Sequence, residues 1–152
     1  MTIKYDQLNQ LVGTCLRRSK FQVFQHVEPI LAEYKLATGQ FSVLLIIKTF
    51  PGQTQVWIAN KASLERSSLT PVFKRLEKLD YIKRSKHPEN VHALAVNITE
   101  KGEQVIDEAS DKLIEFETKL EALFTNEETK NLVSYLQRIE EFGKDLKTAS
   151  KK

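Results

Sequence analysis

Hydroxyl and basic side chains are concentrated in one short segment, SSLTPVFKRLEKLDYIKR, which covers residues 67–84. Its basic residues Lys74, Arg75 and Lys78 fall between apolar residues that recur at spacings of three and four. This spacing predicts an amphipathic helix with a cationic outer face. Hydroxyl groups and cationic side chains both donate hydrogen bonds to phosphate oxygens, so the segment has the chemistry of a polyanion-binding site.

The positive charge of the chain is concentrated in the same region, although the total is only +3. Residues 60–86 hold eight Lys and Arg against three acidic residues, a net charge of +5. Residues 99–152 hold nine basic and thirteen acidic residues, a net charge of −4. We interpret this distribution as a polyanion-binding module joined to an acidic scaffold.

Residue patterns for catalysis or metal binding are absent from the sequence. Three histidines, one cysteine and scattered acids show no metal-ligand spacing, no Gly-rich phosphate loop and no nucleophile elbow. We therefore expect no enzyme activity, no metal and no cofactor.

The sequence also indicates the cellular compartment of the protein. No apolar run approaches the roughly 20 residues that span a bilayer, and the N-terminus has no apolar signal-peptide core. A single cysteine, Cys15, excludes an internal disulfide and suits a reducing compartment. We expect a cytoplasmic protein without a membrane partner.

Helical and strand-like patterns alternate along the chain. Pro29 should bend the first helix near its end, Thr38-Gly39 should break it, and Thr54 should cap the third. Thr99 precedes a long helix, and Thr125 or Asn126 caps the last one. The predicted helices cover about 7–36, 40–49, 55–61, 67–80, 100–124 and 127–146, and the predicted strands cover 81–86 and 92–98.

This order of elements predicts a mainly α fold with a small β wing. A winged helix-turn-helix core (37–98) lies between a long N-terminal helix (1–36) and C-terminal helices (99–147), followed by a disordered tail (148–152). The outer helices are too apolar for the small core to cover. They either form an intramolecular bundle or interdigitate with a second copy, and we favour the homodimer. The residues expected to face inward on the last helix are Leu132, Val133, Leu136, Ile139, Phe142 and Leu146.

Three stretches, GQFSVL, LTPVFKRLEKLDYIKR and ITEKG, resemble the MarR family of bacterial transcriptional regulators. The resemblance covers residues 36–107 closely and the flanking helices in pattern only. It implies a homodimer with two winged helix-turn-helix lobes on a pseudo-palindromic double-stranded DNA operator. It further implies a repressor that a small ligand or oxidation releases.

By this resemblance, residues 67–84 hold the recognition helix, which reads the major groove mainly through its N-terminal residues. Pro71 would lie close enough to the helix start that little hydrogen bonding is lost. Arg66 would reach guanine, and the later basic residues would contact phosphates. The predicted DNA contacts are Thr54, Gln55, Arg66, Ser67, Ser68, Thr70, Pro71, Lys74, Arg75, Lys83, Arg84, Lys86, Asn90 and His92.

The predicted wing departs from the family pattern. Asn90, Val91 and His92 stand where the family commonly has Asp-x-Arg, whose arginine enters the minor groove. We therefore expect weaker or more narrowly tuned DNA binding, strengthened at lower pH through His87 and His92.

The resemblance also suggests two switches. Members of the family often bind phenolic carboxylates between the dimer helices and the DNA-binding lobe. The predicted ligand-binding residues are Arg17, Arg18, Phe21, Phe24, His26, Phe41 and Trp57. The alternative is peroxide sensing by Cys15, although this thiol lies on the apolar stripe, where thiols are usually buried. A winged-helix module that binds protein rather than DNA is a third interpretation.

Overall fold

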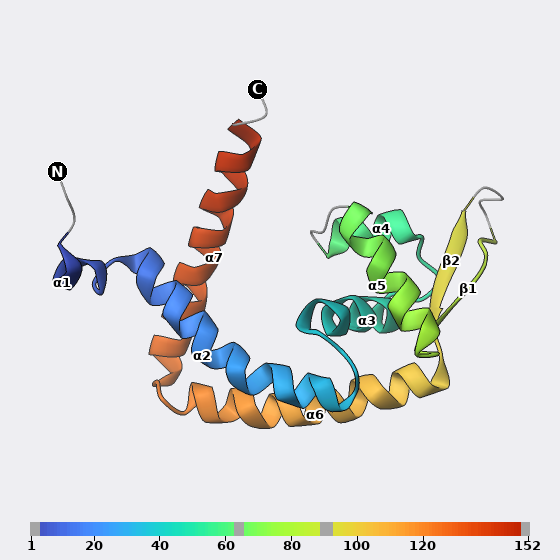
Figure 1. Cartoon of the computed structure of the whole chain (residues 1–152), viewed down its shortest axis with the longest axis horizontal. Helices are drawn as coiled ribbons and strands as arrows, with labels where there is room; N and C mark the ends of the chain where they lie inside the picture. Colours follow the sequence, from blue (N-terminus) through green and yellow to red (C-terminus); the bar gives the residue numbers. More distant parts are fainter. Residues whose placement is uncertain (1–3, 63–65, 89–92, 150–152) are drawn as a thin grey trace. The chain divides into compact units, whose positions relative to one another are not determined.

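The computed structural model describes residues 4–62, 66–88 and 93–149, and the chain divides into two compact units, residues 1–113 and 114–152 (Figure 1). The side chains of Arg66, Ser67 and Ser68 lie outside this description, as do residues 89–92.

The N-terminal helix predicted over 7–36 is two helices, α1 (Tyr5–Leu8) and α2 (Val12–Glu33). The prediction that Thr38-Gly39 ends this helix is wrong. The chain turns earlier, at Lys35, where φ is 57°. The Leu36 and Lys35 N–H groups donate to the Leu31 and Ala32 carbonyls, which is a Schellman motif without its usual glycine. Leu31 and Leu36 are both buried, so core packing stabilises this turn.

Three helices form the centre of the first unit. They are α3 (Thr38–Thr49), α4 (Gln55–Lys61) and α5 (Arg66–Lys78). Thr54 caps α4 as predicted, because its hydroxyl accepts a hydrogen bond from the Trp57 N–H at 3.2 Å. The fully buried side chains include Val43, Leu44, Ile47, Ile58, Phe73 and Leu76.

The predicted hairpin is present as β1 (Ile82–Lys86) and β2 (Leu94–Ile98), which pair antiparallel. Ile82 lies opposite Ile98, and Lys86 lies opposite Leu94. Val96 joins β2 to the α3–α4 connection, since its N–H donates to the Gln53 carbonyl and its carbonyl accepts from the Gly52 N–H. Ile82 is buried and the rest of β1 is exposed, whereas Ala95 and Val96 of β2 are buried, so the hairpin packs on the core through β2 and the first residue of β1.

Helix α6 (Glu100–Glu121) begins directly after Thr99, as predicted, and the Thr99 hydroxyl accepts a hydrogen bond from the Gly102 N–H at 3.0 Å. Its first half packs on the core through Ile106 and Ala109. Two ion pairs add to this packing, Lys48 with Asp107 and Lys112 with Glu33. Gly102 is required there, because a Cβ at this position would lie 2.1 Å from the Tyr81 carbonyl oxygen.

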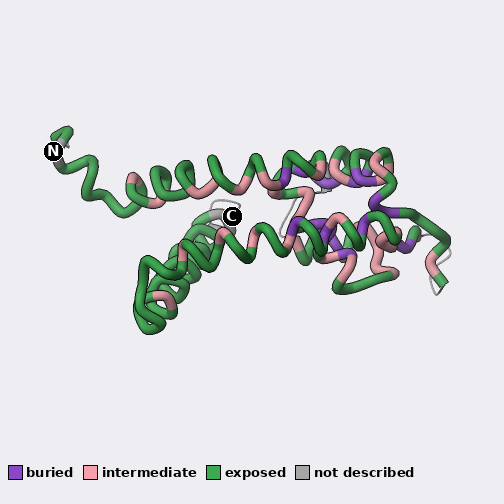
Figure 2. Tube along the Cα trace, turned by 90° about the horizontal axis from the view of Figure 1, so that it is seen from below, coloured by how far each residue is buried: buried purple, intermediate pink, exposed green. Residues whose placement is uncertain are grey.

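In the second unit, α7 (Asn126–Ala149) begins at Thr125, whose hydroxyl accepts from the Glu128 N–H at 3.2 Å. The helix continues two residues into the tail expected to be disordered from residue 148, and residues 150–152 lie outside the description. Figure 2 shows buried positions in the first unit and an exposed α7. All six residues expected to face inward on α7 are exposed in this chain.

No single helix within the described residues is long and apolar enough to cross a membrane. In the part of the chain that the structure describes, the pair α2 and α3 passes that test by length and composition, with a 62° bend between the two helices.

Candidate nucleic-acid interface

The two faces of α5 separate apolar from polar residues. Leu69, Phe73 and Leu76 are buried on the inner face. The exposed residues are Thr70, Pro71, Lys74, Arg75 and Lys78. The helix therefore presents a hydroxyl group and three cations to solvent while its apolar face is held by the core.

Pro71 lies inside α5, as its sixth residue. It therefore does not mark the helix boundary. A proline at this depth removes one backbone hydrogen bond, and its exposed position lets water replace that bond.

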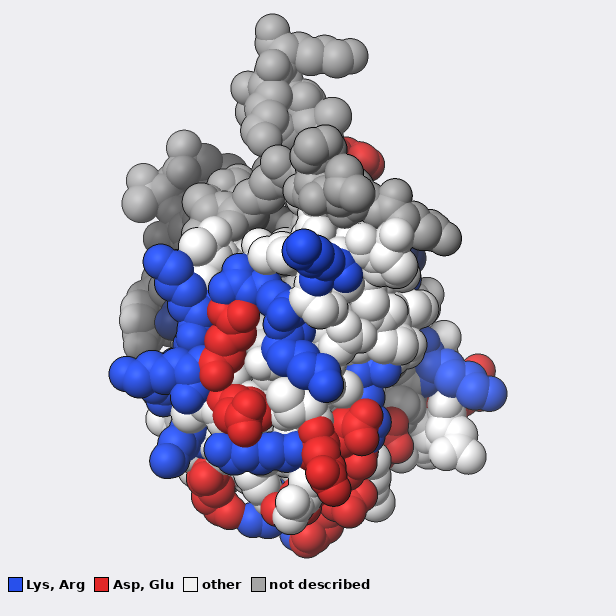
Figure 3. Space-filling view, turned by 90° about the vertical axis from the view of Figure 1, so that its right-hand side faces the viewer, with Lys and Arg blue, Asp and Glu red and all other residues white. Residues whose placement is uncertain are grey.

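The hairpin adds further cations beside α5. Lys83 and Lys86 are exposed on β1. Figure 3 shows this side of the molecule, where Lys and Arg side chains lie across the middle and along the left of the face, with Asp and Glu side chains among them and below them. Phosphate groups are attracted by such a cationic area over distances of about a Debye length.

Arg84 differs from the other predicted DNA contacts. Its Nε and Nη2 donate to Oε1 and Oε2 of Glu77, the carboxylate in the last part of α5. The two side chains are only 30% and 28% exposed. The charge of this arginine is therefore shared with a carboxylate rather than presented alone to solvent.

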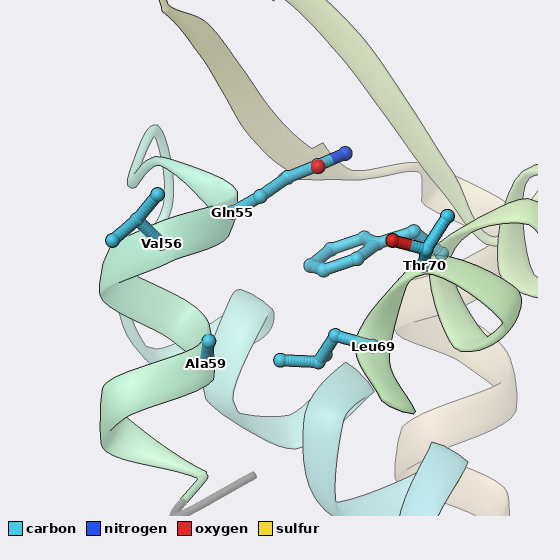
Figure 4. Close-up of a pocket in the computed structure, with 6 residues that line it drawn as sticks. Gln55, Val56, Ala59, Leu69 and Thr70 are labelled. Carbon is cyan, nitrogen blue, oxygen red and sulfur yellow. The ribbon is translucent and has the colours of Figure 1, made fainter. Parts of the chain in front are cut away.

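A pocket of about 220 Å³ lies between α4 and α5 and is lined by residues of both helices. Figure 4 shows Ala59 of α4 and Leu69 of α5 low in this gap, with Gln55 and Thr70 above them. The predicted contacts Gln55 and Thr70 thus lie at one opening between the two helices. Sequence reasoning missed the pocket, for which the small side chain of Ala59 was the available signal. Its lining residues are Gln55, Val56, Ala59, Leu69, Thr70 and Phe73.

Several predicted DNA contacts lie outside the described parts of the chain. They are the side chains of Arg66, Ser67 and Ser68, together with Asn90 and His92. Thr54 is described, and its hydroxyl already accepts from the Trp57 N–H.

The predicted ligand-binding residues fall into two groups. Phe41 and Trp57 are partly buried against the core, and the Trp57 ring lies 5.1 Å from that of Phe50. The α2 residues have other neighbours: Arg18 donates to Asn9 Oδ1 at 3.2 Å, and Lys20 Nζ lies 5.2 Å from the Phe24 ring centroid. The remaining members of this group, Arg17, Phe21 and His26, are exposed.

Cys15 is exposed in this chain. The expectation of a buried thiol is therefore wrong for the single chain, because α2 has no core residues beside this turn. The Cys15 thiol donates to the Asn9 carbonyl at 3.4 Å. Among the described residues, no group of three or more His, Cys, Asp or Glu could hold a metal ion.

Comparisons with known proteins agree with this architecture. The model of the MarR family matches residues 36–91. The HTH-type transcriptional regulator BilQ of Clostridioides difficile is 24% identical over 147 residues, which cover 97% of this chain and 94% of BilQ.

Two solved structures of the transcriptional repressor CouR have the same fold. The one bound to a 23-mer DNA duplex has a TM-score of 0.81 and 27% identity, covering 92% of this chain and 99% of CouR. The one bound to p-coumaroyl-CoA has a TM-score of 0.77 and 28% identity, covering 91% of this chain and 98% of CouR.

Proposed function

Because this chain belongs to the MarR family of transcriptional regulators, we propose that it is a homodimeric repressor that binds a pseudo-palindromic DNA operator. The observation that carries the proposal is the outer face of α5. Thr70, Lys74, Arg75 and Lys78 are exposed there, while the buried inner face holds the helix rigidly. A helix of this kind fits the major groove.

The contacts divide by chemistry. Thr70 and Gln55, which both line the pocket between α4 and α5, would contact base edges. Lys74, Arg75 and Lys78 lie farther along α5 and contact phosphates, which position the protein without reading sequence. The other predicted contacts, Arg66, Ser67, Ser68, Asn90 and His92, would also bind the duplex, and they lie outside the described side chains.

The second copy is proposed to cover α7. A run of exposed apolar side chains along one helix is typical of an interaction surface, and C₂ homodimers are the commonest oligomers. The amphipathic residues of α7 recur at the spacing that an inward face requires. Two copies would place two recognition helices about one duplex turn apart.

A small aromatic carboxylate is proposed to release the DNA. Arg17, Arg18 and His26 would bind the carboxylate, and Phe21, Phe24, Phe41 and Trp57 would contact the ring. The ligand acts only if it binds the DNA-incompetent geometry more tightly. That the related CouR binds p-coumaroyl-CoA supports this class of ligand.

Oxidation of Cys15 is the second candidate switch, because the thiol is exposed. Mass spectrometry after mild treatment with an organic peroxide tests it. An unmodified Cys15 with unchanged DNA binding would exclude this mechanism.

The central proposal is tested by selecting duplexes from a randomised 30-base-pair pool and titrating the selected duplex with salt. We expect log Kd to rise steeply with log salt, because each neutralised phosphate contributes a slope of about 0.9. Replacing Lys74 and Arg75 together with alanine should weaken binding to all duplexes and lower that slope. Lys144→Ala on α7 is the control. A shallow salt dependence would favour a protein partner instead.

A further inference from the structure

The corner where α5 passes into the hairpin holds an ion pair with two hydrogen bonds. Glu77 lies in the last two turns of α5 and Arg84 lies in the middle of β1. Both carboxylate oxygens accept from the guanidinium, one from Nε and one from Nη2. This fork arrangement fixes direction as well as distance, unlike the single contact of a lysine.

The backbone between the two residues is also held. Asp80 adopts φ 61°, and the Tyr81 N–H donates to the Leu76 carbonyl at 2.9 Å. Beyond this turn the strand begins with buried Ile82, after which β1 is exposed. The ion pair therefore links α5 directly to the exposed part of β1, whereas the core holds the hairpin through Ile82 and through Ala95 and Val96 of β2.

We propose that Arg84 is a positioning residue rather than a phosphate contact: with Glu77 it sets the orientation of the hairpin relative to the recognition helix. This inference rests on the proposed DNA-binding function. The exposed cations of the same strand, Lys83 and Lys86, contact the phosphates. The orientation of the hairpin relative to α5 matters for DNA binding. With α5 in the groove, this orientation decides whether the cations of β1 meet the duplex.

The two possible roles of Arg84, phosphate contact and positioning residue, predict opposite effects on DNA affinity when Glu77 is removed. If Arg84 contacts phosphate, then Glu77 is a competing anion near DNA, and its removal should strengthen binding. If the pair positions the hairpin, removal of Glu77 should weaken binding although the surface becomes more positive. The sign of one substitution thus separates the interpretations.

The experiment uses the full-length protein and a duplex that it selects from the randomised pool. We expect Glu77→Gln and Arg84→Gln each to raise Kd about three- to tenfold, the range for a partly exposed charged pair. Arg84→Gln should leave the salt slope unchanged. Lys83→Gln, next to Arg84 on the strand, is the matched control and should lower the slope by about 1.

The exchanged pair, Glu77→Arg with Arg84→Glu, should recover most of the lost affinity, because the same two groups meet with their roles reversed. Circular dichroism of each variant confirms that it is folded. Tighter or unchanged binding by Glu77→Gln, or a salt slope lowered by a full unit in Arg84→Gln, would overturn the inference while leaving the proposed function intact. If the unsubstituted protein selects no duplex, both proposals fail.

Discussion

The inner face of the DNA-binding lobe and the apolar face of α7 have the same sequence pattern but opposite environments. Leu76 of α5 is 0% exposed, whereas Phe142 of α7 is 63% exposed. Both lie on amphipathic helices with apolar residues at spacings of three and four. The periodicity of apolar residues therefore identifies the helix face that must be buried. It does not say whether the covering residues belong to the same chain or to a second copy. Four pairs of substitutions test this contrast.

Replacing the same residue type in each region gives the strongest test. Phe73→Ala should lower the free energy of unfolding by about 3–5 kcal/mol, because it removes a buried aromatic side chain from the core. Phe142→Ala should leave unfolding of the first unit nearly unchanged. Urea unfolding followed by the fluorescence of Trp57, the single tryptophan, measures the first unit. Equal losses in the free energy of unfolding for the two variants would contradict the difference between the two regions.

A charge placed on the apolar face of α7 should separate the two copies. Leu136→Glu should weaken dimerisation about a hundredfold or more, because an unpaired carboxylate cannot be buried cheaply. Sedimentation at micromolar concentration measures the change. Gln137→Glu adds the same charge at the neighbouring position, outside the apolar set, and should remain dimeric. A wild-type protein that sediments as a monomer would contradict the proposed assembly.

Glycine-to-alanine substitutions should change the stability of the protein in opposite directions in the two regions. Gly102→Ala would place a Cβ 2.1 Å from the Tyr81 carbonyl oxygen and 2.8 Å from Ile98 Cγ1, which should cost about 1–3 kcal/mol of stability. Gly143→Ala meets nothing within 4 Å and should add helix propensity to α7. Thermal unfolding of both variants is the measurement. No loss in Gly102→Ala would mean that α6 can move away from Tyr81.

The smallest effect concerns one hydroxyl. Tyr81 is buried and donates to the Tyr34 carbonyl at 2.9 Å, so Tyr81→Phe should cost about 1 kcal/mol. The exposed Tyr135 of α7 is the control, and Tyr135→Phe should cost much less.

Burial also raises the pKa of Tyr81 above its ordinary value of 10.0, opposed in part by the positive charge of Arg75. The folded protein therefore holds this proton more tightly than the unfolded chain. Its contribution to stability is present below about pH 10 and is lost as the pH rises through the folded pKa. Urea unfolding between pH 8 and 10.5 should show this loss in the wild type, and Tyr81→Phe should lack it.

Local signals predicted much of the fold. Thr54 caps its helix as predicted, Thr125 is the cap of the two candidates Thr125 and Asn126, and Thr99 caps the helix that it was predicted to precede; these starts were predictable because a cap is formed within four consecutive residues. The approximate bounds of the hairpin and the amphipathic character of α5 were also predictable, because both follow from residue patterns within a short segment. The end of α2 was not, since Lys35 has no turn preference and the turn depends on Leu31 and Leu36 entering a common core.

The candidate site divides in the same way. The cationic segment, the amphipathic helices and the resemblance to the MarR family could be read from the sequence, because these depend on residue order alone. Only the tertiary structure decided that Arg84 meets Glu77, that a pocket opens between α4 and α5, and that Cys15 and the apolar face of α7 are exposed. Each of these depends on which elements the chain brings together or leaves apart, and that balance of packing is settled only when the whole chain has folded.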